Sequence, residues 1–196
     1  VMLMRLDPDW AKALQAVESG NLCLQDVQES RRGDREFVLA AVRRNALQLE
    51  HASQELRGDR EIVLAAVRER GRALAFASGA MRGDREVVLA AVRKDGLAVR
   101  HASESARKDP VVGLAAVQQN GWSLELLGEE LRAHREIVWT AIEQEGQAIK
   151  FVADELRTSR DLVIAAVKSN AEALRVIPSE LKRDAEVQRA HQRANP

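Results

Sequence analysis

One motif recurs along the chain at a fixed interval of 25 residues. RGDREFVLAAV begins at Arg32, RGDREIVLAAV at Arg57 and RGDREVVLAAV at Arg82, with no insertion between the copies. With Asp34 as position 1, the pattern gives seven full repeats, at residues 9–33, 34–58, 59–83, 84–108, 109–133, 134–158 and 159–183. Residues 1–8 match the tail of a preceding repeat, and residues 184–196 match a partial C-terminal capping repeat. This period predicts an array in which neighbouring repeats complete one another's cores.

Each repeat carries the signals of a helix of about ten residues followed by a shorter one. Aspartate at position 1 is an N-cap residue, and glutamate at position 3 complements the helix dipole. Apolar residues at positions 5, 6, 8 and 9, such as Val38, Leu39, Ala41 and Val42, predict a helix with neighbours on several sides. Glycine at position 13, as in Gly96, predicts a left-handed helix C-cap. The predicted fold is therefore an all-α solenoid of short helical repeats.

The pattern DREIVLAAVRxxGxALxxASxELR resembles the tandem helical repeat of the domain of unknown function 4116 family, over essentially the whole chain. The resemblance implies a helical repeat module. It assigns no functional residue, because that family has no established activity. The later repeats depart from the pattern at Pro110, Gly113, His134 and Trp139. Because glycine inside a helix costs about 1 kcal/mol relative to alanine, we expect the fifth repeat, which contains Gly113, to be a bend or a soft joint of the array.

Composition argues against several classes of function. Thirty basic and thirty acidic residues give a net charge of zero, so no overall field attracts nucleic acid or an anionic membrane. Three Trp, three Phe and no Tyr leave few side chains for base stacking. The single cysteine, Cys23, excludes an intrachain disulfide and a cysteine-based zinc site.

The chain contains no apolar run near the roughly 20 residues that cross a bilayer. We therefore expect a soluble, intracellular protein. Val1 is not an initiator methionine, so we also expect that a targeting peptide or more of the array precedes it, which leaves an organelle lumen open as a location.

Two motifs suggest chemistry but have simpler interpretations. Three Arg-Gly-Asp triplets would suit an adhesion receptor, but each aspartate is expected to cap a helix. The segments 51–53 and 101–103 read His-Ala-Ser, which would pair a base with a nucleophile. Phe76, Leu126 and Phe151 take the histidine's position in other repeats, which indicates packing. The two histidines would also lie roughly 20 Å apart, too far for one metal ion. We therefore expect no enzymatic activity, no cofactor and no metal site.

Charged residues recur at fixed positions. Arginines at positions 2 and 24 alternate with acids at positions 1, 3 and 22, which predicts a mixed-charge ladder joining the repeats. Positions 10 and 11 of repeats 2 to 4 are mostly basic, with Arg70 beside them, whereas repeats 5 and 6 have Gln118, Gln119, Glu143 and Gln144 there. The sequence thus predicts a basic patch on one edge, formed by Arg43, Arg44, Arg68, Arg70, Arg93 and Lys94. Cations also suit helix C-termini, which explains part of this pattern equally well.

Position 14 varies most freely against the constant framework. It holds Leu47, Arg72, Leu97 and Trp122, and this variation indicates a recognition edge with Trp122 as its anchor. Our hypothesis is a non-catalytic scaffold that mediates protein–protein interaction, such as an accessory subunit of a larger complex. The alternative is nucleic-acid binding along the basic edge of repeats 2 to 4. Sequence alone identifies neither the partner nor the oligomeric state.

Overall fold

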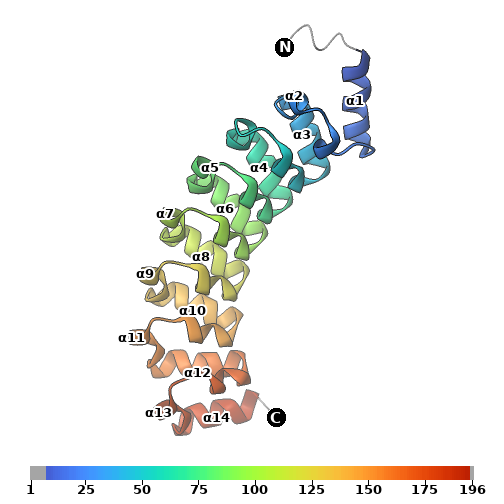
Figure 1. Cartoon of the computed structure of the whole chain (residues 1–196). Helices are drawn as coiled ribbons and strands as arrows, with labels where there is room; N and C mark the ends of the chain where they lie inside the picture. The colour runs from blue at the N-terminus through green and yellow to red at the C-terminus, as the bar shows by residue number, and fades with distance from the viewer. Residues whose placement is uncertain (1–7, 195–196) are drawn as a thin grey trace. The chain divides into compact units, whose positions relative to one another are not determined.

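Helices recur with the 25-residue period in the computed structural model, which describes residues 8–194 (Figure 1). Eight longer α-helices are described: α1 (Pro8–Ser19), α3 (Arg35–Arg44), α4 (Arg60–Glu69), α6 (Arg85–Lys94), α8 (Pro110–Gln119), α10 (Arg135–Gln144), α12 (Arg160–Ser169) and α14 (Ala185–Ala194). Short α-helices stand between them: α2 (Glu29–Arg32), α5 (Gly79–Gly83), α7 (Glu104–Arg107), α9 (Glu129–Arg132), α11 (Asp154–Arg157) and α13 (Ser179–Lys182).

Short 3-10 helices complete the repeats: η2 (Leu24–Asp26), η3 (Ala46–His51), η4 (Leu56–Gly58), η5 (Gly71–Phe76), η6 (Gly96–His101), η7 (Gly121–Leu126), η8 (Gly146–Phe151) and η9 (Ala171–Arg175). Residues 8–194 contain no strand. The protein is an all-α solenoid of short helical repeats, as predicted.

The chain divides between Lys94 and Asp95 into two compact units. In unit 1, the helices α1, α3, α4 and α6 lie side by side in that order, with α2 and α5 along one edge (Figure 1). Unit 2 repeats this arrangement with α8, α10, α12 and α14, while α7, α9, α11 and α13 follow its edge.

The structure describes the two predicted ends of the array to different extents. Of residues 1–8, the predicted tail of a preceding repeat, only Pro8 is described, and it begins α1; the rest lie outside the described residues. The predicted partial repeat contributes α14, which buries Val187 and Ala190 against its neighbour. Between residues 8 and 194, no helix is both long and apolar enough to cross a membrane.

The long helices bury the residues at positions 4, 5, 8 and 9. In α4 these are Ile62, Val63, Ala66 and Val67, each 0% exposed, and the equivalent residues of the other ten-residue helices of repeats 2 to 7 are buried as well. Position 6 was predicted to be buried too, but Leu64 there is only half-buried. That part of the prediction is wrong, because the neighbouring helices lie on either side of the buried positions and leave position 6 facing outward.

Aspartate at position 1 caps the long helices as predicted. Asp34 Oδ1 accepts hydrogen bonds from the N–H groups of Glu36 (2.9 Å) and Phe37 (3.5 Å). Asp59 and Asp84 accept equivalent bonds at the starts of α4 and α6. These bonds satisfy N–H groups that have no partner inside the helix.

Glycine at position 13 has a different role from the one predicted. Among the described residues, a positive φ occurs only at Gly20 (φ 82°), so no position-13 glycine is a left-handed C-cap. A Cβ on Gly121 would instead lie 2.5 Å from the carbonyl oxygen of Ala141 in the next repeat. Gly96 and Gly146 approach the next repeat's backbone in the same way. At these three repeats, glycine at position 13 lets successive repeats come into backbone contact.

A backbone hydrogen bond also joins successive repeats. The N–H of Ser53 donates to the carbonyl of Arg32 (3.0 Å), and that of Ser78 donates to Arg57 (2.8 Å). Gly128 and Ala153 make the same bond in unit 2. Since only main-chain atoms take part, this link depends on the spacing of the repeats rather than on side-chain identity.

Helix α8 continues through Gly113 without interruption. Gly113 is buried, and a Cβ there would lie 2.7 Å from Cδ1 of Leu131 and 3.3 Å from Cδ1 of Leu127. Position 19, where Leu127 stands, holds alanine in repeats 2 to 4. Leu131 and Leu127 thus together occupy the space next to Gly113 that a side chain at position 5 would need, which keeps the interior packed.

We expect Gly121→Ala to lower the free energy of unfolding by about 1–3 kcal/mol, because the methyl group would push the next repeat away. Ala46 and Ala171 occupy this position in repeats 2 and 7, so the expected loss applies to the close approach at Gly121 and not to every repeat. Gly79→Ala is the control, because no atom lies within 4 Å of a Cβ at that site. Urea unfolding measures both, and equal stability of the two variants would contradict the proposed close approach.

Gly113 and Leu127 should be energetically coupled. Gly113→Val alone should destabilise the chain by about 1–3 kcal/mol through overpacking, and Leu127→Ala alone by about 2–5 kcal/mol through a cavity. In the double variant, the decrease in the free energy of unfolding should be smaller than the sum of the two single decreases by at least about 1 kcal/mol. Combining Gly113→Val with Leu162→Ala, a buried site two repeats away, should give additive losses in the same denaturation experiment.

Candidate functional site

Arginine at position 2 links each repeat to the acids that begin the next one. Arg35 Nε lies 3.0 Å from Asp59 Oδ2, and its guanidinium also pairs with Glu61. Arg160 Nε lies 2.9 Å from Asp184 Oδ2. Equivalent pairs join Arg60 to Asp84 and Glu86, and Arg135 to Asp161. The predicted ladder is confirmed for positions 1, 2 and 3.

These contacts lower the pKa of the capping carboxylates. The Val87 N–H donates to Asp84 and, together with the Arg60 guanidinium, outweighs partial burial and holds the pKa of that carboxyl below its usual range. At Asp59, partial burial raises the pKa, but hydrogen bonds from the Ile62 N–H and Arg35 outweigh it, so the pKa is lowered overall. Each aspartate therefore serves both its own helix and the preceding repeat.

The arginine link is changed at two junctions between repeats. In the first repeat, Trp10 takes the arginine's place, its indole Nε1 lies 3.4 Å from Asp34 Oδ2, and its ring packs edge-on against Phe37 at 5.4 Å. Between repeats 5 and 6, Pro110 stands where the arginine would be and His134 stands where the aspartate would be. The arginine and the capping aspartate are thus absent together at that junction, while the position-3 acid, Glu136, is kept.

Arginine at position 24 does not join the ladder as predicted. Arg32 donates to the carbonyls of Val27 (3.1 Å) and Gln25 (2.6 Å), and Lys182 donates to the carbonyl of Arg175 (3.0 Å). These side chains reach back to carbonyls of their own repeat. Arg157 forms a local ion pair with Asp154. Position 24 therefore mainly supports the loop after the 3-10 helix.

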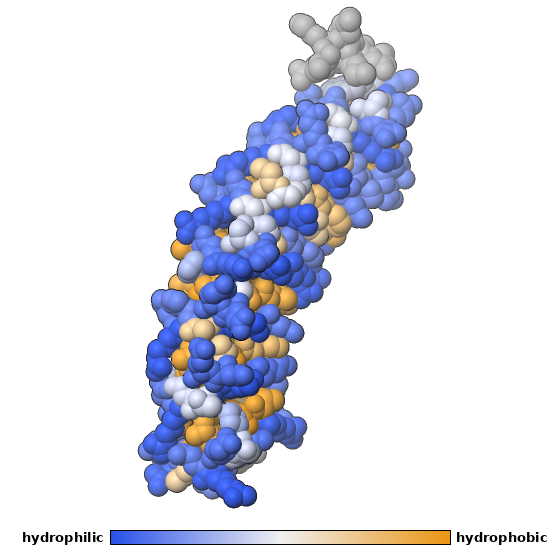
Figure 2. All heavy atoms as spheres, turned by 60° about the vertical axis from the view of Figure 1, so that its left-hand side comes forward, coloured by the Kyte–Doolittle hydropathy of each residue, from blue (hydrophilic) through white to orange (hydrophobic). Residues whose placement is uncertain are grey.

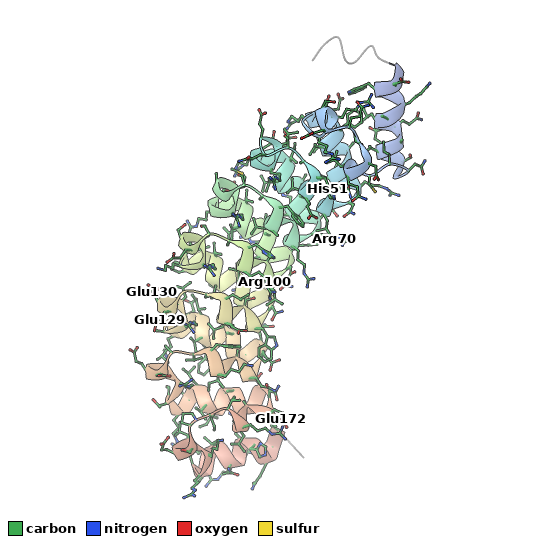
Figure 3. All side chains as sticks on the ribbon, viewed as in Figure 1. His51, Arg70, Arg100, Glu129, Glu130 and Glu172 are labelled. Atoms are coloured by element: carbon green, nitrogen blue, oxygen red, sulfur yellow. The ribbon has the colours of Figure 1, made fainter. Side chains whose placement is uncertain are left out.

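The side chains that suggested adhesion or hydrolysis take part in local structure. The aspartates of the Arg-Gly-Asp triplets cap helices and face a donor from the preceding repeat. His51 is half-buried (Figure 3), and the nearby Ser53 Oγ accepts from the Leu56 N–H at 3.4 Å. Ser103 Oγ likewise accepts from Ala106. Within residues 8–194, no three His, Cys, Asp or Glu side chains gather where they could hold a metal ion.

A row of apolar side chains on the long helices reaches the surface of each unit. Position 6 holds Leu39, Leu64 and Leu89 in unit 1, and all three are half-buried. In unit 2 the row continues with Leu114, Trp139 and Ile164. Figure 2 shows hydrophobic residues at the surface as separate patches among hydrophilic ones. Trp139 stands over a hollow of about 510 Å³, and its Nε1 donates to Glu143 Oε1 at 2.7 Å.

Grooves run between the long helices of unit 1. The groove between α4 and α6 has a volume of about 570 Å³, with Leu64, Leu89 and Ala90 among its apolar walls and Arg68, Glu86, Arg93 and Lys94 as its charged lining. A second groove of about 450 Å³ lies between α1 and α3, and its lining includes Leu39, Arg43 and Arg44. A third hollow, of about 370 Å³, brings Arg44 close to Arg70. The structure therefore distributes the predicted basic residues over three neighbouring hollows.

The predicted basic residues are exposed and without acidic partners. We call Arg43, Arg44, Arg68, Arg70, Arg93 and Lys94 the basic edge; they stand in or just after the last turns of α3, α4 and α6. None of them forms an ion pair or side-chain hydrogen bond with any described residue. Figure 3 shows Arg70 at the edge where α4 ends. They differ in this from the position-2 arginines, whose charges are neutralised within the fold.

The predicted position-14 residues lie on the 3-10 helices. Leu47 and Arg72 belong to unit 1, and neither lines the grooves of that unit described above; Leu97 and Trp122 belong to unit 2. Trp122 packs edge-on against Phe151 of the next repeat at 6.0 Å. Lys150 Nζ lies 4.8 Å from the Trp122 ring centroid and covers it further. The ring thus braces two repeats, which reduces the surface it offers as an anchor.

Sequence reasoning missed two sets of residues. Leu64 and Leu89 were assigned to the core. An aliphatic row next to a row of alanines could instead have indicated a helix face that no neighbouring helix covers. Position 12 was also overlooked, where Asn45, Asp95 and Asn120 cap the 3-10 helices by accepting from the N–H two residues later. Asparagine or aspartate just before a short helix is the signal that could have found these caps.

Comparison with known proteins identifies one family. The family model described as Domain of unknown function (DUF4116) matches residues 12–57, 34–82, 59–107, 84–132 and 134–182. Each match is about two repeats long, and four of the five begin at position 1 of a repeat. Neither a curated protein nor a solved structure matches the chain.

The lowered pKa values of Asp59 and Asp84 predict an acid-dependent loss of stability. Their charge contributes fully above the unfolded-state pKa of about 3.9, and the contribution disappears as the pH falls through the lower folded-state values. The double variant Asp59→Asn, Asp84→Asn keeps side-chain caps but loses the charges. Between pH 7 and pH 3 it should therefore lose less unfolding free energy than the unmodified chain, by about 1 kcal/mol.

Urea unfolding at the two pH values measures this difference. Asp26→Asn is the control, because that carboxylate makes no hydrogen bond or ion pair with a described residue. Equal acid losses in the double variant and the unmodified chain would show that the ladder does not contribute.

Proposed function

The chain belongs to the family described as Domain of unknown function (DUF4116), and we propose that it is a non-catalytic helical-repeat scaffold that binds other proteins. Its role would be that of an accessory subunit in a larger complex. The family description names no activity, so the surface of the chain supplies the support for this proposal.

The outward row at position 6 is the observation that carries the proposal. Leu39, Leu64 and Leu89 are not needed to close the interior, because positions 4, 5, 8 and 9 already fill it. They nevertheless remain aliphatic, and they line grooves between the helices. Apolar side chains set in grooves with a charged rim are typical of surfaces that bind protein segments.

A catalytic role has less support. The histidines and serines that would suit acid–base or nucleophilic chemistry occupy packing and capping positions, as His51 and Ser53 do. The aspartates with lowered pKa values are engaged by arginine and by backbone N–H groups. These groups are used by the fold itself.

Nucleic-acid binding is the second candidate, and the unpaired basic edge favours it. Such binding would rest on contacts between arginine or lysine and phosphate, and it would weaken steeply with added salt. If the chain retains neither duplex DNA nor RNA at about 50 mM salt, this candidate is refuted. The apolar walls of the grooves favour a protein partner, since the phosphates of a nucleic acid would not contact them.

The leucine row should carry partner binding. The variant Leu64→Ser, Leu89→Ser should reduce recovery of co-purifying proteins about tenfold when the tagged chain is purified from cells that naturally make it. The control Val111→Ser, Val176→Ser changes two other exposed aliphatic residues, 47% and 37% exposed, and should leave recovery unchanged. Circular dichroism checks that both variants fold. Equal recovery with both variants would refute this surface.

A further inference from the structure

We infer that the groove between α4 and α6 binds an acidic, leucine-bearing segment of a partner protein, held by Arg68, Arg93 and Lys94. This inference rests on the proposed protein-binding function and specifies the partner's chemistry. Three features support it: the walls of the groove, the unpaired charge on its rim, and the absence of any need for that charge in the fold.

The walls of the groove suit an aliphatic side chain. Leu64 from α4 and Leu89 and Ala90 from α6 are all half-buried, so they present apolar surface that is still in contact with water. A volume of about 570 Å³ accommodates leucine-sized side chains of a bound segment. Covering these walls would remove apolar surface from water, which favours association.

Charge complementarity decides the chemistry of the occupant. Arg68, Arg93 and Lys94 are exposed and have no acidic partner among the described residues. The single acid that lines the groove, Glu86, already pairs with Arg60 of the preceding repeat. The groove therefore presents a net positive rim, and carboxylates of a bound segment would neutralise it.

The helix dipole does not account for these cations. Cations favour helix C-termini by about 0.3–1 kcal/mol each, so Arg68, Arg93 and Lys94 stabilise their helices to some extent. In unit 2, however, α8 ends with two glutamines and α10 ends with Glu143 and Gln144, and both are ten-residue helices of the same repeat geometry. The fold thus forms two such helices without cations at these positions, although α12 keeps Lys168, so the helix geometry does not require the cations of unit 1.

A protein segment fits better than a nucleic acid. Single-stranded nucleic acids are held largely by stacking on aromatic rings, and no aromatic residue lines this groove. Trp10 and Phe37 of unit 1 are buried against each other instead. A duplex would contact the rim through its phosphates and leave Leu64 and Leu89 exposed.

Selection of random peptides displayed on phage against the intact 196-residue chain tests the inference. Acidic, leucine-containing peptides should be enriched on the unmodified chain and not on Arg68→Gln, Arg93→Gln. Glutamine occurs at the equivalent positions of repeat 5 and at the end of α10, so this variant should fold. The matched control Gln118→Glu, Gln144→Glu makes the same change in net charge in unit 2 and should enrich the same peptides as the unmodified chain.

A labelled synthetic helix with leucines on one face and glutamates on the other measures the affinity. It should bind the arginine variant about tenfold more weakly than the unmodified chain or the control. The same helix with lysines in place of glutamates should not bind. Displacement of the glutamate helix by duplex DNA, with no effect of Leu64→Ser, Leu89→Ser, would overturn the inference in favour of nucleic acid.

The outcomes separate the inference from the proposed function. If peptides are enriched but are not acidic, or bind the arginine variant equally well, the inference fails while protein binding stands. If no peptide of any composition is enriched on the unmodified chain, both fail. Enrichment of acidic peptides that depends on both the arginines and the leucines supports both.

Discussion

Close backbone contact between successive repeats is the constraint on which the rest of this structure depends. Neither a ten-residue helix nor a six-residue 3-10 helix is stable alone in water, so each must dock on its neighbours. The docking brings Gly121 against the carbonyl of Ala141 and joins Ser53 to Arg32 through their main chains. At that separation a single added methyl group has no room, which explains why small residues recur at position 13.

Two departures from the repeat pattern are each accompanied by a second change for the same reason. Gly113 removes volume that Leu127 restores within the same repeat. Pro110 removes a donor at the junction where His134 removes its acceptor. In an array whose positions touch the same or the next repeat, a change at one site alters the requirement at another, so single departures would leave either a cavity or an unpaired charge.

The charged residues of the protein divide into two classes. The position-2 arginines Arg35 and Arg60 are neutralised by the next repeat and serve cohesion, whereas the basic edge in unit 1 has no such partner among residues 8–194. We propose that this unneutralised charge, together with the half-buried leucines, binds a partner protein. Sequence alone located the basic residues correctly at helix ends. It did not find the leucines beside them, because an aliphatic residue that recurs in most repeats gives the same sequence pattern whether it lies in a core or in a groove.

The sequence by itself determined the repeat length, the all-α class, the aspartate caps and the arginine-to-acid links, since these follow from local signals and from a constant spacing of 25 residues. Tertiary structure decided what each position faces. Glycine at position 13 serves close approach rather than a left-handed turn, leucine at position 6 faces outward, and Trp122 packs on Phe151. Each of these depends on the separation and angle between neighbouring repeats. That geometry arises from contacts between residues that lie about one repeat apart in the chain, so no local pattern specifies it.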